Sequence, residues 1–125
     1  MGRYYNGDIE GKFWFGIQSS TDANFFGVEP YEPNYVNYYF EKEEHLKMVK
    51  NGIKECEKVL GKNLKTLDKF FNENNGYNDD MIVEQTNIRE EEISYLLKWY
   101  ARIKLGTQIR DCLIEQGECQ FEAEL

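Results

Sequence analysis

Residues 87–116 constrain the fold more than any other stretch of this chain. On an α-helix, at about 100° per residue, they place an apolar stripe along one side. That stripe consists of Ile93, Leu96, Tyr100, Ile103 and Ile114. From Trp99 onward the other side is apolar too, with Leu105, Ile109, Cys112 and Leu113. A helix that is apolar nearly all round must be covered nearly all round, and 125 residues offer little material for this. The pattern therefore predicts a second copy of the chain against this helix.

Basic residues recur along the second side of the same helix. Lys98, Arg102, Gly106 and Arg110 follow one another every four residues. Arginine binds phosphate through its planar guanidinium, and a glycine between two arginines leaves room for a ligand to approach the helix. Ordinary salt bridges with the many acidic residues are the alternative interpretation, and the sequence leaves both open.

Composition excludes several classes of protein. The formal net charge is -8, and general DNA or RNA binding requires the neutralisation of phosphates by basic residues. A local basic pocket for a small anion is still compatible with this charge. The mean hydropathy is -0.72, and no run approaches the roughly 20 apolar residues that span a bilayer, so we expect no membrane partner. The N-terminus lacks an apolar signal region, which predicts a cytoplasmic location.

Patterns of enzymes and metal sites are missing from the sequence. Cys56, Cys112 and Cys119 are odd in number and form no CxxC pair, which predicts reduced, structural thiols. His45 is the only histidine, and there is no Gly-x-Ser-x-Gly elbow, Walker loop or dinucleotide-binding fingerprint. We therefore expect a protein that is not an enzyme and that holds neither a metal nor a cofactor.

Three segments are expected to form a small antiparallel sheet. Residues 12–18 alternate as a strand does, and residues 34–40 are rich in aromatic and β-branched side chains. Residues 118–125 alternate apolar with polar side chains and are expected to return to the N-terminal sheet. Between the first two strands, Ser20 is expected to cap one helical turn that ends at Gly27.

Two long helical segments are expected to back this sheet. Residues 43–74 carry an apolar stripe in steps of three or four, with an expected kink near Gly61. The second is the helix described above, where Asn87 with Glu90 resembles a capping box and Gly117 can end the helix in the left-handed conformation. The expected fold is therefore a single domain, residues 1–125, of the α+β class.

Aromatic side chains supply the second part of a predicted ligand site. Most of them lie in the β-rich part, residues 1–40, whereas Trp99 lies close to Arg102 in the sequence. Planar rings stack on bases and arginine binds phosphate, so these residue types together suit a nucleotide. Aromatic residues of a small sheet also form hydrophobic cores, which is the alternative. The candidate ligand contacts are Arg102, Arg110, Lys98, Gly106, Trp99, Phe13, Trp14, Gln18 and Tyr39.

The opening block GRYYNGDIEGKF, residues 2–13, and an aromatic sheet followed by two late helices resemble the phage-encoded anti-Thoeris sponge family. The resemblance covers the whole length in order and size, without a short diagnostic motif. It implies a protein without catalytic activity that binds cyclic ADP-ribose isomers made by bacterial TIR-domain proteins. By holding them, such a protein keeps them from activating the defence effector in the host cytoplasm. The resemblance also implies a homo-oligomer, a dimer or a ring of dimers, which in some members holds cyclic oligonucleotides at separate pockets.

Two other classes fit the sequence. One is an acidic inhibitor that covers a host defence protein with its Glu-rich second half, for example by mimicking nucleic acid. The other is a structural or interaction module that only forms oligomers. The leading hypothesis is the sequestration of an anionic cyclic nucleotide at a contact between subunits, without bond breaking. A ligand pocket beside Arg102 and Arg110 would favour it, whereas the absence of such a pocket would favour the interaction module.

Overall fold

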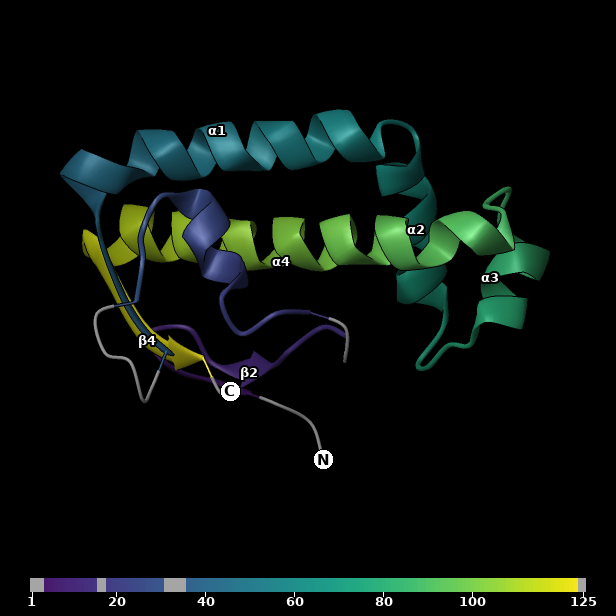
Figure 1. The fold of residues 1–125 in the computed structure, drawn as a ribbon, viewed down its shortest axis with the longest axis horizontal. Coiled ribbons are helices and arrows are strands. Elements are labelled where there is room, and N and C mark those ends of the chain that lie inside the picture. The colour runs from purple at the N-terminus through teal and green to yellow at the C-terminus, as the bar shows by residue number, and fades with distance from the viewer. Residues whose placement is uncertain (1–3, 16–17, 31–35, 124–125) are drawn as a thin grey trace.

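The computed structural model describes residues 4–15, 18–30 and 36–123 (Figure 1). This part of the chain has the predicted α+β class, an antiparallel sheet with two long helices stacked beside it. In chain order the elements are β1 (Tyr4–Gly7), β2 (Gly11–Lys12), the 3-10 helix η1 (Asp22–Phe26), β3 (Val36–Glu41), α1 (Lys42–Leu60), α2 (Asn63–Glu73), α3 (Asp79–Gln85), the 3-10 helix η2 (Glu90–Glu92), α4 (Ile93–Gln116) and β4 (Glu118–Ala123).

The sheet is organised around the last strand of the chain. Its order is β2-β1-β4-β3, and each neighbouring pair is antiparallel. Apolar side chains of β4 alternate with polar ones and point into the core. Tyr38 of β3 lies opposite Phe121 of β4, and their rings stack with centroids 5.4 Å apart. The predicted return of residues 118–125 to the N-terminal sheet is confirmed up to Ala123, while residues 124–125 lie outside the described part.

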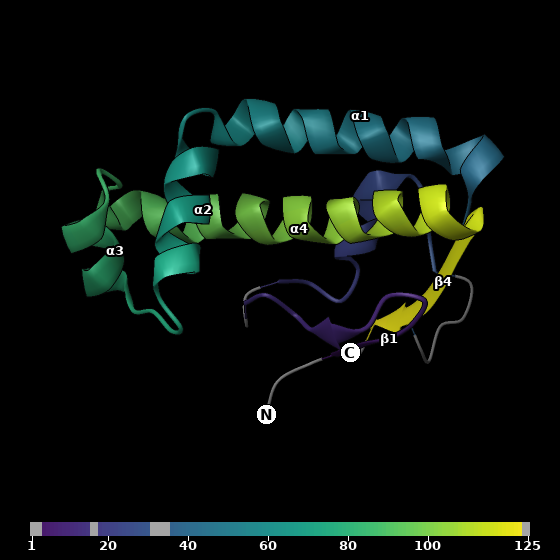
Figure 2. The same ribbon diagram turned by 180° about the vertical axis from the view of Figure 1, so that it is seen from behind.

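The long helices α1 and α4 lie side by side, and α2 crosses one end of them (Figures 1 and 2). Helix α4 lies between α1 and the sheet, and η1 packs against both helices. The second apolar side of α4 is therefore buried within one chain: Leu105 is 1% exposed and Ile109 is 0% exposed. The reasoning that this helix requires a second copy was wrong, because η1 and the sheet cover the side that α1 leaves. Within the described residues, no helix has the length and apolar character needed to cross a bilayer.

The predicted strand at residues 12–18 is wrong. Only Gly11–Lys12 pairs with β1, and the chain then leaves the sheet. The alternation is real, since Phe13 and Phe15 are buried and Trp14 is exposed. However, the aromatic side chains pack on other rings, and the backbone here forms no strand. The ring of Phe13 stacks on that of Tyr5 with centroids 4.2 Å apart. The predicted strand at residues 34–40 is confirmed from Val36 to Phe40. Residues 16–17 and 34–35 lie outside the described part.

Two of the predicted helices have different boundaries. The segment 43–74 breaks completely at Gly61, where the expectation was a kink, and α2 starts at Asn63. Gly61 has a φ of 53°, in the region that favours glycine. Helix α4 begins at Ile93, after η2, and no side chain caps it, so the predicted capping box at Asn87 is wrong. The reason is that Glu90 takes part in a separate 3-10 turn.

The predicted helix caps are confirmed at the C-terminal ends but not at Ser20. Ser20 does not cap η1, whose N-cap residue is Thr21 without a side-chain cap bond. Ser20 is instead a buried polar residue, at 9% exposure. Gly27 and Gly117 end η1 and α4 in the left-handed conformation, as predicted.

Candidate functional site

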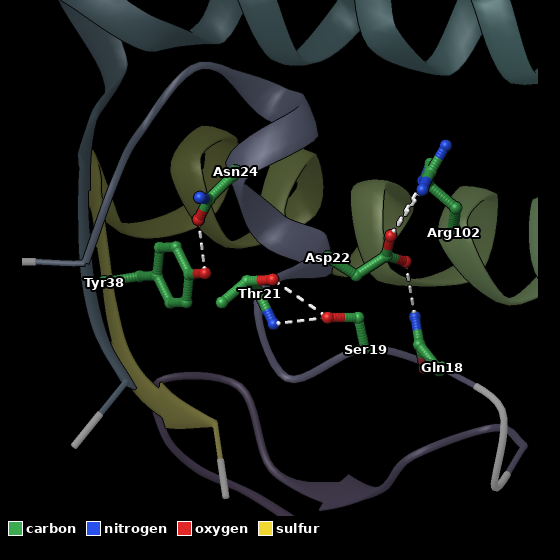
Figure 3. A network of polar contacts seen from close by, with 7 residues as sticks. All are labelled: Gln18, Ser19, Thr21, Asp22, Asn24, Tyr38 and Arg102. Atoms are coloured by element: carbon green, nitrogen blue, oxygen red, sulfur yellow. Dashed lines mark hydrogen bonds and ion pairs between the residues drawn. The ribbon is translucent and has the colours of Figure 1, made fainter. Parts of the chain in front are cut away.

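Arg102 is engaged in a buried ion pair. Its Nε and Nη2 both lie 2.8 Å from Oδ1 of Asp22, whose side chain is 3% exposed (Figure 3). The amide of Gln18 donates to the other carboxylate oxygen of Asp22 at 2.9 Å. The guanidinium carbon of Arg102 also lies 4.6 Å from the ring centroid of Phe25 and 4.5 Å from that of Trp99. The salt-bridge interpretation of the sequence therefore describes Arg102, with Trp99 and Gln18 as its neighbours.

Hydrogen bonds also stabilise the segment that carries Asp22. Ser19 Oγ accepts from the backbone N–H of Thr21 at 3.1 Å, and the two hydroxyls lie 2.8 Å apart. The Tyr38 hydroxyl donates to Asn24 Oδ1, which ties η1 to strand β3 (Figure 3). The Tyr38–Asn24 bond therefore holds η1 from the sheet side, while the Asp22–Arg102 ion pair holds it from the side of α4.

Gly106 does not leave room for a ligand, and that prediction is wrong. A Cβ atom at this position would lie 2.5 Å from ring carbons of Phe26. Gly52 on α1 meets the same ring, with a Cβ 2.7 Å away. The two glycines therefore form a notch between α1 and α4 that the Phe26 side chain, 1% exposed, fills.

The remaining predicted site residues lie apart from one another. Arg110 Nε contacts Asp111 Oδ1 at 3.0 Å, and Lys98 is exposed on α4. The Tyr39 hydroxyl donates to Glu118 at 2.9 Å, and this bond raises the pKa of Tyr39 to about 12. Phe13 belongs to the core. Of the nine predicted contacts, the structure brings together Gln18, Trp99 and Arg102 around Asp22, and places Trp14 in a different site.

That site is a pocket lined largely by aromatic side chains, which we call the aromatic pocket. It has a volume of about 410 Å³ and lies between the segment after β2, the end of α2 and the connection to α3. Trp14 and Tyr77 are each 41% exposed, whereas the ring of Phe15 is buried. Its lining residues are Trp14, Phe15, Phe71, Asn74, Asn75, Gly76 and Tyr77.

Phe71 is the centre of the aromatic packing. Its ring centroid lies 5.6 Å from those of both Phe15 and Tyr77, and it stacks on Tyr100 at 5.4 Å. Trp14 meets Tyr100 edge to face at 5.8 Å. Edge-to-face and offset contacts of this kind are the preferred geometries of aromatic pairs. The walls of the pocket are therefore held by several mutually packed rings.

An ion pair lies beside these rings. Lys104 Nζ is 3.1 Å from Asp68 Oδ1, and the Tyr100 hydroxyl donates to the same oxygen at 2.7 Å. Burial, and then the bond to Asp68, raise the pKa of Tyr100, so this hydroxyl stays a donor. The Lys104 ammonium also lies 5.7 Å from the Trp14 ring centroid. Lys104 therefore lies next to Trp14 but is not one of the lining residues of the aromatic pocket.

The chemistry available at the aromatic pocket is stacking and hydrogen bonding. Among the described residues of its lining, Tyr77 alone is titratable, and its pKa is raised by burial and by Asp79, so it remains neutral. Elsewhere, burial raises the pKa of the Cys56 thiol to about 12 and raises that of Cys119, so both are poor nucleophiles. His45 Nδ1 accepts from the backbone N–H of Glu41 at 2.9 Å. Among the described residues, no group of three or more acidic, His or Cys side chains is placed to hold a metal.

Most residues of the aromatic pocket were missed by the sequence analysis. Trp14 was among the predicted contacts, but Phe71, which lies within the predicted helical segment 43–74, and Tyr77, which lies outside every predicted element, were not. The one signal available was Asn74-Asn75-Gly76-Tyr77, a turn-forming run with an aromatic residue directly after a helix. Comparison of the chain with protein-family models, curated proteins and solved structures found no match in any of the three.

Proposed function

We propose that this chain is a non-catalytic binding protein that captures a small nucleotide by its planar ring in the aromatic pocket. The observation that carries the proposal is that Trp14, Phe71 and Tyr77 line one pocket while Trp14 and Tyr77 each keep 41% of their surface exposed. In its specific form, which rests on the resemblance described above, the captured molecule is a cyclic ADP-ribose-type signal. The biological role is then a phage sponge that blocks Thoeris immunity by sequestration.

The size and lining of the pocket favour a base with its sugar. Ligand pockets typically enclose about 300–1,000 Å³ and combine apolar walls with a few polar groups. A volume of about 410 Å³, with aromatic walls and two asparagines, lies at the lower end of that range. Stacking of a base on an aromatic side chain contributes about 1–3 kcal/mol, and an exposed Trp surface is available for it before the ligand arrives.

Lys104 takes the phosphate-binding role that the sequence analysis gave to Arg102 and Arg110. Its partner is Asp68, and the two side chains are 32% and 41% exposed. Exposed ion pairs of this kind contribute only about 0–1 kcal/mol, so Lys104 can turn to a phosphate held beside Trp14 at little cost. By contrast, if Arg102 turned to a phosphate, the buried carboxylate of Asp22 would lose its ion-pair partner.

Capture without turnover is consistent with the groups in the pocket. General acid–base catalysis needs a side chain whose pKa lies near the working pH. Tyr77 has a raised pKa, and the asparagine amides do not titrate. Sequestration instead requires tight binding, on the order of 12 kcal/mol for a nanomolar dissociation constant. The oligomer implied by the resemblance belongs to the same proposal and is measured by light scattering.

A second candidate function is the acidic inhibitor that covers a host defence protein. It is favoured by a shallow depression of about 370 Å³ whose lining includes four carboxylates. They come from Asp8, Glu10, Asp111 and Glu115.

The proposal is tested by identifying what the protein retains. Purified protein is incubated with a filtrate from cells with active TIR signalling, washed, denatured by heat, and the released molecules are identified by mass spectrometry. We expect an intact cyclic ADP-ribose isomer. A cleaved product alone would indicate an enzyme. Release of nothing would overturn the proposal and make the acidic inhibitor the leading idea, to be followed by capture of host proteins.

Matched variants locate the binding site in the same assay. Trp14→Ala removes the exposed wall of the aromatic pocket and should abolish retention of the ligand. Tyr95→Ala removes an aromatic side chain that is 58% exposed and lies outside the pocket lining, and it should retain the ligand. Equal retention by both variants would place the site elsewhere.

A further inference from the structure

The side-chain amide of Asn74 has a fixed orientation at the wall of the aromatic pocket. Asn74 is the residue directly after α2, and its Nδ2 donates to the backbone carbonyl of Phe70 at 2.8 Å. The same nitrogen donates to Oε1 of Gln85, on α3, at 3.1 Å. A carbonyl oxygen only accepts, so the atom that faces Phe70 has to be the nitrogen. Both hydrogens of the amide are thereby used.

Only the Oδ1 atom of Asn74 is left to interact with a ligand. An amide carbonyl accepts hydrogen bonds and cannot donate them. Within the described residues this atom receives no hydrogen bond, although Asn74 is half-buried and lines the pocket beside Phe71 and Tyr77. The pocket therefore has aromatic walls for a ring, and one of its lining residues carries an acceptor that no described residue uses.

We propose that Asn74 determines ring specificity by accepting a hydrogen bond from an N–H group at the edge of the bound ring. The favoured rings carry an exocyclic amine, as adenine does, and rings whose edge offers acceptors alone are rejected. This inference rests on the proposed function, since it names which planar rings the aromatic pocket takes. A site built to bond an N–H group discriminates against an analogue without it, because its own polar atom is then left unpaired.

Gln85 is the positioning residue for this acceptor. Its Oε1 holds the second hydrogen of the Asn74 amide from a different helix, so without it only the bond to the Phe70 carbonyl restrains the amide. The prediction is specific to the acceptor atom at residue 85. Gln85→Leu removes it, whereas Gln85→Glu keeps a carboxylate oxygen that can accept the same bond.

The test is a calorimetric titration of the full chain with two probes, adenosine monophosphate and the monophosphate of purine riboside. The second probe has the same ring system and phosphate but lacks the 6-amino group. For the parent protein we expect at least about tenfold weaker binding of the purine probe. In Asn74→Ala that difference should disappear, while Asn72→Ala, which changes an exposed residue of α2 outside the pocket lining, should keep it.

The Gln85 variants decide the matter if Asn74→Ala does not fold. Gln85→Leu should lose most of the discrimination between the two probes, and Gln85→Glu should restore it. Equal binding of both probes to the parent protein would overturn the specificity inference and leave the aromatic pocket as a ring-binding site. Binding of neither probe at millimolar concentration would overturn ring binding itself, and the inference with it.

Discussion

Asp22 and Arg102 lie 80 positions apart in the chain, and their charged groups lie 2.8 Å apart in the fold. This contact joins η1 to the middle of α4, with the carboxylate almost fully buried. It means that the most conspicuous basic residue of the sequence stabilises the fold, and that a ligand would have to compete with a carboxylate for it.

Loss of one partner in this pair should destabilise the protein strongly. Arg102→Gln leaves Asp22 buried and unpaired, which costs about 3–5 kcal/mol. Arg110→Gln removes a half-exposed residue whose ion pair to Asp111 contributes about 0–1 kcal/mol, so it serves as the control. Urea unfolding followed by circular dichroism measures both. Equal midpoints for the two variants would show that the buried pair does not stabilise the fold.

The notch for Phe26 predicts a packing defect on adding a single methyl group. Gly106→Ala gains about 1 kcal/mol of helix propensity, but its Cβ would lie 2.5 Å from a buried ring. Overpacking typically costs about 1–3 kcal/mol, so we expect net destabilisation in thermal unfolding. Gly76→Ala meets nothing within 4 Å and should leave the melting temperature unchanged.

The substitution Phe26→Leu, which gives a smaller side chain, tests that explanation. Combined with Gly106→Ala, it should cost less than the sum of the two single changes, because the methyl group then has space. Additive costs would mean that the clash with Phe26 is not the cause.

Lys104 should affect the phosphate and not the ring. Lys104→Gln should weaken binding of adenosine monophosphate about fivefold while leaving adenosine unchanged, because only the former carries charge. Lys98→Gln, an exposed lysine on the same helix, is the matched control. Raising the salt concentration should reproduce the loss in the parent protein. Equal weakening of both probes by Lys104→Gln would assign Lys104 a structural role.

Buried tyrosines should make the fold sensitive to alkali. Burial raises the pKa of Tyr38 above its ordinary value of 10, with a further contribution from Asp22, and burial and Asp68 do the same for Tyr100. A pKa that is raised in the folded state contributes stability that is fully present below pH 10 and is lost as the pH rises above it. We therefore expect the urea concentration at the unfolding midpoint to decrease as the pH is raised above 10.

A spectrophotometric titration of tyrosine tests this pH dependence. Tyr38 and Tyr100 should ionise only together with unfolding, and Tyr38→Phe should reduce the alkaline loss of stability. A smooth titration of every tyrosine near pH 10 in a protein that stays folded would contradict it.

Sequence periodicity was sufficient for the elements whose signal is local. The stripe of α4 from Ile93 to Ile103 and the alternation of residues 118–123 each follow from side chains a few positions apart, whereas at Gly61 only a kink was expected. The left-handed glycines at 27 and 117 follow from the same local rules. The prediction of a strand at residues 12–18 was wrong because alternation does not reveal whether a neighbouring strand exists. The rings of Phe13 and Phe15 pack on other aromatic rings instead.

The sequence by itself determined the α+β class, the two long apolar helices and the position of the last strand. The tertiary structure decided which surfaces those helices cover and which side chains remain free. Gly106 adjoins Phe26, Arg102 adjoins Asp22, and Trp14 meets Phe71 near Tyr77, across separations that no local pattern records. The physical reason is that periodicity fixes the direction of a side chain on its own element, whereas packing of distant elements fixes what lies in that direction.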